Sequence, residues 1–452
     1  MWVLEGAVVG MVKSAKSLLC LCVLLGAADV ACARFLSPKD ARSVPRARVA
    51  CYPSSTVGTR YPDPFHLGPH SYRFSPWERN GIVYTCRGGH IDITHLRKAA
   101  DWTAYLASRI QRTLLSDKTT FSYRMHEPSR HHLQFEYPQG WASLPRNVRE
   151  RIAADVAIEV AEYCTYTGMV WHEILTWYGY KAIGFYTEYP SAFSWEDVYS
   201  NLLGCRLAGE ALRDPGLDFD EAVTILLDQE LQKLGVQARP AAWQAGQVVR
   251  GQWFVGDFLA CDIVKRNLDI GWDDGFVTPW VVPGMAGCPD ETPAAYPAPN
   301  LSALSEYHFS AKYEIEPREW ERKEILRPLC PPGRGRPARI EPAQHLGAIM
   351  EYIRAQAIHR YGPYVDDQTL PSPTTPQPPV VTPAGTEGVV AGSPVMTGAS
   401  LGVQPEAARE EMHSGRYGYV GPEPARGNAG GGHRPAIDEI LTFAYFWLGE
   451  EP

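Results

Sequence analysis

The sequence predicts an α+β fold in which a small, mainly antiparallel sheet packs against a layer of three or four helices. One observation is the order of elements: short β-like runs with one helical segment come first, and longer segments with the apolar spacing of helices follow. A second is composition, since 45% of the 452 residues are hydrophobic and 21% are charged. This length and hydrophobic content are enough for one large or two ordinary packed domains. They exclude a wholly disordered or coiled-coil protein.

The first part of the main domain is predicted to contain strands, a helix and a hairpin. β-like runs at residues 81–86 and 90–95 are separated by a glycine-containing turn, and residues 99–115 then follow helical spacing. A further pair of strands is expected at residues 119–125 and 132–137.

Three consecutive helices are predicted next. Apolar residues recur every three or four positions across residues 147–180, which indicates the core face of one long helix. A second helix is expected to begin after Ser194, whose hydroxyl can cap the free amides, with Asp197 three residues on. A third helix covers residues 220–234, and a last amphipathic helix of the main domain covers residues 344–359. Short connections between the three helices predict an antiparallel helical layer.

Five segments are expected along the chain. They are an export signal at residues 1–33, an irregular segment at 34–80, the main α+β domain at 81–365, a disordered Pro/Gly-rich linker at 366–435 and a short apolar C-terminal helix at 436–452. The signal is indicated by Lys13 and Lys16 ahead of the apolar run 18–25, and cleavage is expected after Ala33. Lipid attachment at Cys32 is the alternative processing event.

Net charge and cysteine content exclude several classes of protein. The formal net charge is −8, from 43 Lys and Arg against 51 Asp and Glu, so no basic surplus is present to bind a nucleic-acid backbone. Three of the ten cysteines lie in the signal, and the other seven leave at least one thiol free or paired with another molecule. No two of the seven have CxxC spacing, which argues against a structural zinc ribbon. These seven are Cys51, Cys86, Cys164, Cys205, Cys261, Cys288 and Cys330.

The segment from Cys86 to His95 is the richest in polar functional groups. On a strand, His90 and Asp92 project from the same face, which suits either two metal ligands or a general base oriented by a carboxylate. His95 has the opposite parity unless the strand ends by Thr94. A strand end with hydrogen-bonded surface groups is the alternative interpretation.

A second candidate lies on the predicted long helix, in the run from Trp171 to Trp177. His172 and Glu173 begin like the HExxH zinc motif, but Thr176 stands where that motif needs its second histidine. Glu162 and Glu173 share one face of the helix about three turns apart, with His172 to the side. On a largely buried helix such groups need partners, which are either a metal or a salt-bridge network.

Several of these motifs together resemble a known family. They are Gly88-Gly89-His90-Ile91-Asp92 with His95 and Arg97, Trp171-His172-Glu173 with Thr176-Trp177-Tyr178-Gly179, Ser191-Ala192-Phe193-Ser194 with Glu196-Asp197 and Ser200-Asn201, and Asp274-Gly275 with Thr278-Pro279. On these residues, the stretch from Cys51 to Pro283 resembles the uncharacterised bacterial family called domain of unknown function 4056. Its members look like exported or lipid-anchored proteins of Gram-negative bacteria. The resemblance implies a location in the periplasm or at the outer membrane, and it implies no known reaction.

The leading functional hypothesis is a metal-assisted hydrolase of the cell envelope. It requires the strand and the helix to converge, so that one carboxylate acts as a base on an activated water. The candidate catalytic residues are His90, Asp92, His172 and Glu173. The candidate ligands of a divalent metal such as zinc are His90, Asp92, His172 and Glu162.

Two other hypotheses remain open. One is a non-catalytic envelope protein that binds lipid, a glycan or a protein partner through its aromatic residues, which include 13 Trp and 23 Tyr. The other is a papain-like cysteine enzyme that pairs Cys86 or Cys164 with His90.

Overall fold

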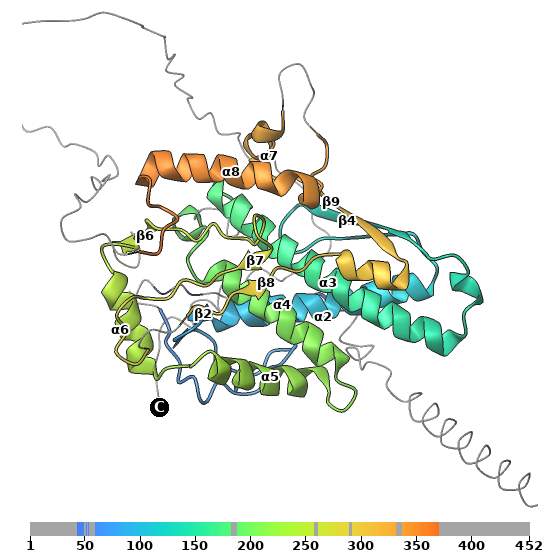
Figure 1. The fold of residues 1–452 in the computed structure, drawn as a ribbon, viewed down its shortest axis with the longest axis horizontal. Coiled ribbons are helices and arrows are strands. Elements are labelled where there is room, and N and C mark those ends of the chain that lie inside the picture. Colours follow the sequence, from blue (N-terminus) through green and yellow to red (C-terminus); the bar gives the residue numbers. More distant parts are fainter. Residues whose placement is uncertain are drawn as a thin grey trace, which may run out of the picture. The chain divides into compact units, whose positions relative to one another are not determined.

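The computed structural model describes residues 43–48, 51, 53, 59–181, 188–256, 261–288, 292–330 and 337–369. The predicted export signal, the predicted linker beyond Thr369 and the predicted C-terminal helix lie outside the described residues. Within the described part the fold is α+β with antiparallel sheets, as the sequence predicts (Figure 1).

The strands form several small sheets. β1 (Ile82–Thr85) and β2 (Gly89–Asp92) make a hairpin in which Ile82 pairs with Asp92. The largest sheet among the described residues has the order β3-β4-β9, and all its strands are antiparallel. It joins β3 (Thr120–Tyr123) and β4 (Arg130–Glu136) to the distant β9 (Ser310–Glu316).

Two further hairpin-like pairs complete the strands of the described part. β5 (Phe254–Val255) pairs with β6 (Asp262–Ile263), and β7 (Phe276–Val277) pairs with β8 (Tyr296–Pro297). Each pair is only two residues long.

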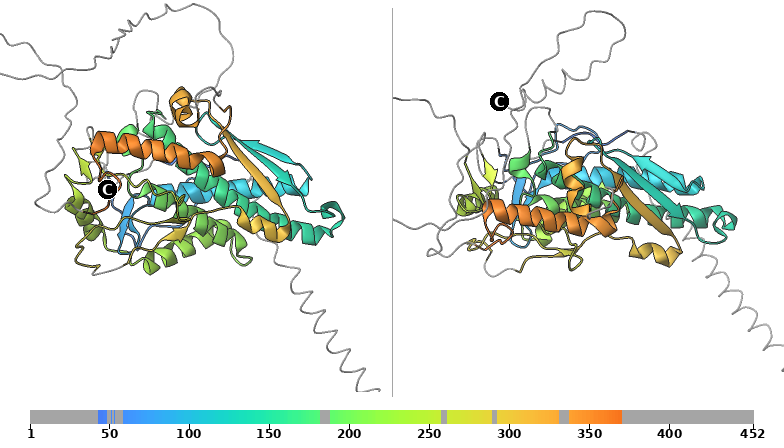
Figure 2. Two further views of the ribbon diagram at one scale, coloured as in Figure 1. Left: turned by 45° about the horizontal axis from the view of Figure 1, so that its top comes forward. Right: turned by 90° about the horizontal axis from the view of Figure 1, so that it is seen from above.

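Three helices form the centre of the described domain. α2 (Ile93–Leu115) packs against both α3 (Arg146–Trp177) and α4 (Asp197–Arg213). In Figure 1, α8 (Pro342–Tyr361) lies above these helices and α5 (Phe219–Lys233) lies below them. Figure 2 shows the same arrangement from two further directions.

Two shorter helices are α6 (Arg239–Val249) and α7 (Arg322–Ile325). None of the helices formed by the described residues combines the length and the apolar composition needed to cross a membrane.

Burial explains why these segments are helical. The predicted apolar stripe of the long helix is the buried face of α3, from Val156 to Leu175. Trp102 of α2 and Trp171 of α3 are fully buried in the main core. A second, smaller core is centred on Trp195 and Trp253 and packs α6 against the β1 hairpin.

The described residues from 43 to 80 form no helix or strand, yet they are bound to the domain. Arg48 forms ion pairs with Glu78 at 2.6 Å and with Asp101 of α2 at 2.8 Å. Tyr61 and Tyr72 bury their rings in the two cores. Ion pairs and buried rings therefore attach this irregular segment to α2 and the hairpin.

Two predicted boundaries were wrong, and both corrections concern the site. β2 ends at Asp92, because the Asp92 carboxylate accepts the Thr94 N–H at 2.6 Å and begins α2 there. The helix therefore starts six residues before the predicted residue 99. α4 begins at Asp197, and the Ser194 hydroxyl donates to the Glu196 carboxylate at 2.6 Å instead of capping the helix amides.

Candidate functional site

The junction of β2 and α2 places Asp92 and His95 side by side. Because Asp92 is the N-cap, His95 lies in the first turn of α2 and its Nδ1 is 3.1 Å from Asp92 Oδ2. The same carboxylate oxygen accepts the Cys51 N–H at 3.1 Å. The Asp92 N–H donates to Ser200 Oγ at 2.9 Å, which ties this junction to α4. Asp92 is fully buried, so its carboxylate depends on these partners.

His95 is held between two carboxylates. Its Nδ1 is 2.9 Å from Oδ1 of Asp197, the first residue of α4, as well as 3.1 Å from Asp92. The His95 side chain is 10% exposed. Burial by itself would lower the pKa of His95, but the charges of Asp197 and Asp92 raise it well above its ordinary value. His95 is therefore an imidazolium that neutralises part of a buried negative charge.

Glu173 of α3 interacts electrostatically with this ion pair. Its Oε2 accepts the Phe193 N–H at 2.9 Å, and the residue is 3% exposed. Burial and the charge of Asp197 raise the pKa of Glu173, while His172 and His95 oppose that rise. Glu173 therefore connects the His95 ion pair electrostatically to His172.

Glu196 adds a further buried carboxyl group. Its Oε2 accepts the Ser194 hydroxyl, and its Oε1 has no hydrogen-bond partner among the described residues. Burial and the neighbouring Asp197 raise the pKa of Glu196 well above its ordinary value. We expect Glu196 to be protonated at neutral pH.

His172 and Glu127 form a second imidazole–carboxylate pair. Glu127 lies in the connection between β3 and β4, and its Oε1 is 2.7 Å from Nδ1 of His172. Burial would raise the pKa of Glu127, but the hydrogen bond and charge of His172 lower it far below its ordinary value. Burial and Lys98 would lower the pKa of His172, and Glu127 more than offsets them, so the pKa is raised.

The two ring nitrogens of His172 have different surroundings. Nδ1 is engaged by Glu127, whereas the nearest carboxylate to Nε2 is that of Glu188, at 3.7 Å. This separation exceeds hydrogen-bond length. The His172 side chain is 16% exposed, against 10% for His95, so it is the more accessible of these two imidazoles.

We name these seven residues the carboxylate–imidazole cluster. It unites the start of α2, the C-terminal half of α3, the start of α4 and the β3–β4 connection. Its five carboxyl groups outnumber its two imidazoles, and burial raises the pKa of two of these carboxyl groups, those of Glu173 and Glu196. The members are Asp92, His95, Glu127, His172, Glu173, Glu196 and Asp197.

Three of the four predicted catalytic residues lie in this cluster, and His90 does not. Asp92, His172 and Glu173 are members, whereas His90 belongs to the second core. There the indole Nε1–H of Trp195 donates to His90 Nδ1 at 3.2 Å, and the Tyr84 ring packs edge-on against it. Burial lowers the pKa of His90 to about 3, so this imidazole is neutral.

The predicted metal ligands are not assembled. No group of three or more His, Cys, Asp or Glu residues in the described part of the chain could hold a metal ion. Glu162 lies eleven residues before Glu173, which is about 16 Å along the axis of α3. It pairs instead with Arg213 at 3.0 Å, and burial raises its pKa to about 7. His90, Asp92, His172 and Glu162 therefore form no shared ligand set.

The cysteines of the papain-like hypothesis have other roles. Cys86 forms a disulfide with Cys288, and a disulfide-bonded cysteine has no thiol to act as a nucleophile. Cys164 is fully buried in α3, and burial raises the pKa of its thiol. Neither residue is placed to form a thiolate beside His90.

Sequence reasoning missed four members of the cluster. Strand parity argues against His95 unless the strand ends by Thr94, although the i, i+3 spacing of His95 from Asp92 is the spacing of a capped helix start. Asp197 is predicted from the sequence only as part of a helix start, and Glu196 only as part of the motif that resembles the family. Glu127 stands before Pro128 in a connection that looks like an ordinary turn, and no local signal distinguishes it.

Comparison with known proteins gives a resemblance to one family and no activity. No curated protein and no solved structure matches the chain. Residues 57–269 match the model of a family described as protein of unknown function (DUF4056). Every member of the carboxylate–imidazole cluster falls inside the matched stretch, so the resemblance to this family covers the whole candidate site.

Proposed function

We propose that this chain is a hydrolase of the cell envelope in which His172 acts as the general acid and base. One observation supports the proposal above all: Glu127 engages Nδ1 of His172 at 2.7 Å, while no hydrogen-bond partner occupies Nε2 among the described residues. An imidazole oriented by a carboxylate at one nitrogen, and accessible at the other, is the arrangement that proton transfer requires.

The pair determines how the imidazole would work. Glu127 accepts a hydrogen bond from Nδ1–H, so neutral His172 keeps its proton on Nδ1 and presents a lone pair at Nε2. That nitrogen can take a proton from a water molecule that attacks a substrate, and can return it to the leaving group. The raised pKa of His172 favours the protonated state that the second step needs.

The rest of the cluster would position this pair. Glu173 is adjacent to His172 in sequence, and its charge state is linked to both His172 and His95. We assign Glu173, His95 and Asp92 as positioning residues. The proposal uses side-chain acid–base chemistry because the described residues assemble no group of three metal ligands.

The envelope location is part of the proposal. It is supported by the signal-like order of residues 1–33. The disulfide between Cys86 and Cys288 is compatible with an oxidising compartment.

A second candidate function is non-catalytic binding of lipid, a glycan or a protein partner. Phe65, Phe74 and Trp77 are 51%, 72% and 77% exposed, and all three come from the irregular segment before β1. Large apolar side chains this exposed are typical of contact surfaces. If binding were the only function, the carboxylate–imidazole cluster would be a structural network.

A matched pair of variants tests the catalytic proposal. The full chain, exported in a Gram-negative host, would be assayed against peptides, esters, glycosides and peptidoglycan fragments. His172→Gln should lower kcat/KM by roughly 10²- to 10⁴-fold, the range for loss of a general acid–base group. His132→Gln is the control, because His132 also pairs with a carboxylate, at 2.9 Å, and is 17% exposed.

Two results would overturn the proposal. One is that the folded wild-type chain hydrolyses none of these substrates, which would favour the binding function. The other is that His172→Gln retains the activity of the wild type, which would place the chemistry elsewhere.

A further inference from the structure

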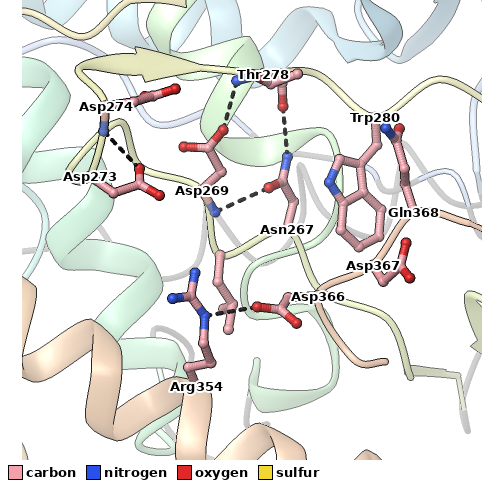
Figure 3. Close-up of a pocket in the computed structure, with 11 residues that line it drawn as sticks. Asn267, Asp269, Asp273, Asp274, Thr278, Trp280, Arg354, Asp366, Asp367 and Gln368 are labelled. Carbon is pink, nitrogen blue, oxygen red and sulfur yellow. Dashed lines mark hydrogen bonds and ion pairs between the residues drawn. The ribbon is translucent and has the colours of Figure 1, made fainter. Parts of the chain in front are cut away.

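A cleft lies apart from the carboxylate–imidazole cluster and shares no residue with it. Its volume is about 360 Å³, within the roughly 300–1,000 Å³ typical of small-molecule sites. Its walls come from the loop before β7, from the residues just after β7, from α8 and from the segment after α8 (Figure 3). Most of its lining lies beyond residue 269, outside the stretch that matches the family.

The lining is strongly acidic. Five aspartates face one arginine, and Arg354 is already paired with Asp366 at 2.7 Å. The Asp269 carboxylate accepts hydrogen bonds from the N–H groups of Gly271 and Thr278, which hold it beside the first residue after β7. Asp273 and Asp274 are exposed. One carboxylate oxygen of Asp273 accepts the Asp274 N–H, and one of Asp274 accepts the Phe276 N–H. An anionic ligand is therefore disfavoured by charge.

Trp280 supplies an unused hydrogen-bond donor inside the cleft. The residue is 6% exposed, and its ring packs against Trp253 at 5.3 Å between centroids. Its indole N–H has no acceptor among the described residues, and Figure 3 shows the nitrogen edge of the ring turned toward Asn267 and the open space. The ring of Trp280 is more than nine-tenths buried, but its N–H opens into the cleft, where an acceptor on a ligand or a water molecule can bind it.

Gln368, which is half-buried, lies beside Trp280 and adds a second polar group to the cleft (Figure 3). Its Oε1 accepts the Val281 N–H at 3.2 Å, which orients the amide and leaves its NH₂ group without an acceptor among the described residues. The cleft thus presents carboxylate acceptors together with two neutral N–H donors. A ligand that satisfies both kinds must donate and accept hydrogen bonds.

The alternatives to a hydroxylated ligand fit less well. A metal ion needs several oxygen ligands around one point, and no three acidic or histidine side chains of the described part converge in that way. A polyamine would satisfy the aspartates but offers no acceptor to Trp280 and Gln368. The hydroxyl groups of a sugar both donate and accept, and its apolar faces pack against aromatic rings.

From these contacts we propose that the cleft binds a neutral saccharide, with Asp273 accepting hydrogen bonds from its hydroxyl groups and Trp280 donating one. The inference does not depend on the hydrolase proposal, because it rests on different residues. Saccharide binding would nevertheless bring an envelope glycan to the same domain that contains the carboxylate–imidazole cluster.

Calorimetric titration of the full chain tests the proposal. The probes are maltotriose and triacetylchitotriose, with calcium chloride and spermidine as rival ligands. At least one saccharide should bind. Trp280→Phe should weaken it roughly twofold to tenfold, as loss of one neutral hydrogen bond predicts, and Asp273→Asn should weaken it roughly tenfold. Trp320→Phe is the matched control, since Trp320 is 97% exposed and does not line the cleft.

Each other result contradicts the proposal. Binding of calcium or spermidine alone would make the cleft a cation site. Absence of saccharide binding at 10 mM, or binding unchanged by both Trp280→Phe and Asp273→Asn, would also overturn it. Asp273 is exposed, so its variant tests the idea even if Trp280→Phe disturbs the second core. His172→Gln should leave saccharide affinity unchanged, which separates this test from that of the hydrolase proposal.

Discussion

The pairs His172–Glu127 and His132–Glu316 are alike in length and in the exposure of their imidazoles, but they differ at the second ring nitrogen of the histidine. Their N–O distances are 2.7 and 2.9 Å, and their imidazoles are 16% and 17% exposed. On β4, His132 Nδ1 is also 2.9 Å from the Ser122 hydroxyl, so both of its nitrogens are engaged. His172 has only one nitrogen engaged, and this difference makes it the better candidate for proton transfer.

The surroundings of the two pairs differ as well. His132 and Glu316 lie on the partly solvated face of a three-stranded sheet, where water screens their charges. His172 is linked through the buried Glu173 to the His95 ion pair, where water is largely excluded. Removing one partner of such a pair should therefore cost little stability in the solvated region and much in the buried one.

The largest expected effect is that of removing the His95 imidazolium from the carboxylate–imidazole cluster. His95→Ala leaves Asp92 and Asp197 buried without their shared partner, and we expect a loss of about 3–5 kcal/mol in the free energy of unfolding. The control His132→Ala should cost less than about 1 kcal/mol. Urea unfolding at pH 6 measures both, and equal losses would show that burial does not distinguish the two regions.

An intermediate effect is expected from Glu127→Gln. The variant keeps the shape and an acceptor but removes the charge, and we expect a loss of about 1–3 kcal/mol. Glu127 has a lowered pKa, so its contribution is present above its ordinary value of 4.5 and is lost as pH falls. His172 has a raised pKa, so its contribution is present below its ordinary value of 6.5 and is lost as pH rises through the folded value.

The destabilisation by Glu127→Gln should therefore be greatest between about pH 4.5 and pH 6.5. NMR titration of His172 should show a lower pKa in the variant, because Glu127 raises it in the native protein. An unchanged His172 titration would refute the assigned pairing.

The smallest expected effect is that of Glu196→Gln. The pKa of Glu196 is raised in the folded state. Above the ordinary pKa of 4.5, the unfolded chain loses the Glu196 proton while the folded chain keeps it. Native stability therefore falls as pH rises, and the neutral glutamine removes this penalty. The variant should match the wild type within about 0.5 kcal/mol at pH 4 and exceed it at pH 8. A variant less stable than the wild type at pH 8 would mean that Glu196 is ionised in the native state.

Local patterns were enough to predict most of the helices and three of the site residues. The spacing of apolar residues on α3 and the β3–β4 hairpin follow from the immediate sequence, because a buried face repeats at the period of its own element. His172 and Glu173 were found because two ionisable groups on a buried helix need partners. The partners themselves, Glu127 and Asp197, come from other elements and have no such local signal.

By itself, the sequence determined the α+β class, the antiparallel pairing of β3 with β4, the buried face of α3 and the acidic balance of the chain. Only the tertiary structure decided that His95 joins Asp92 and Asp197, that His90 packs in a separate core, and that Cys86 bonds to Cys288. The physical reason is that periodicity and capping are set by neighbours along the chain. Charge neutralisation in a buried site is set by which elements pack together, and packing brings distant residues into contact.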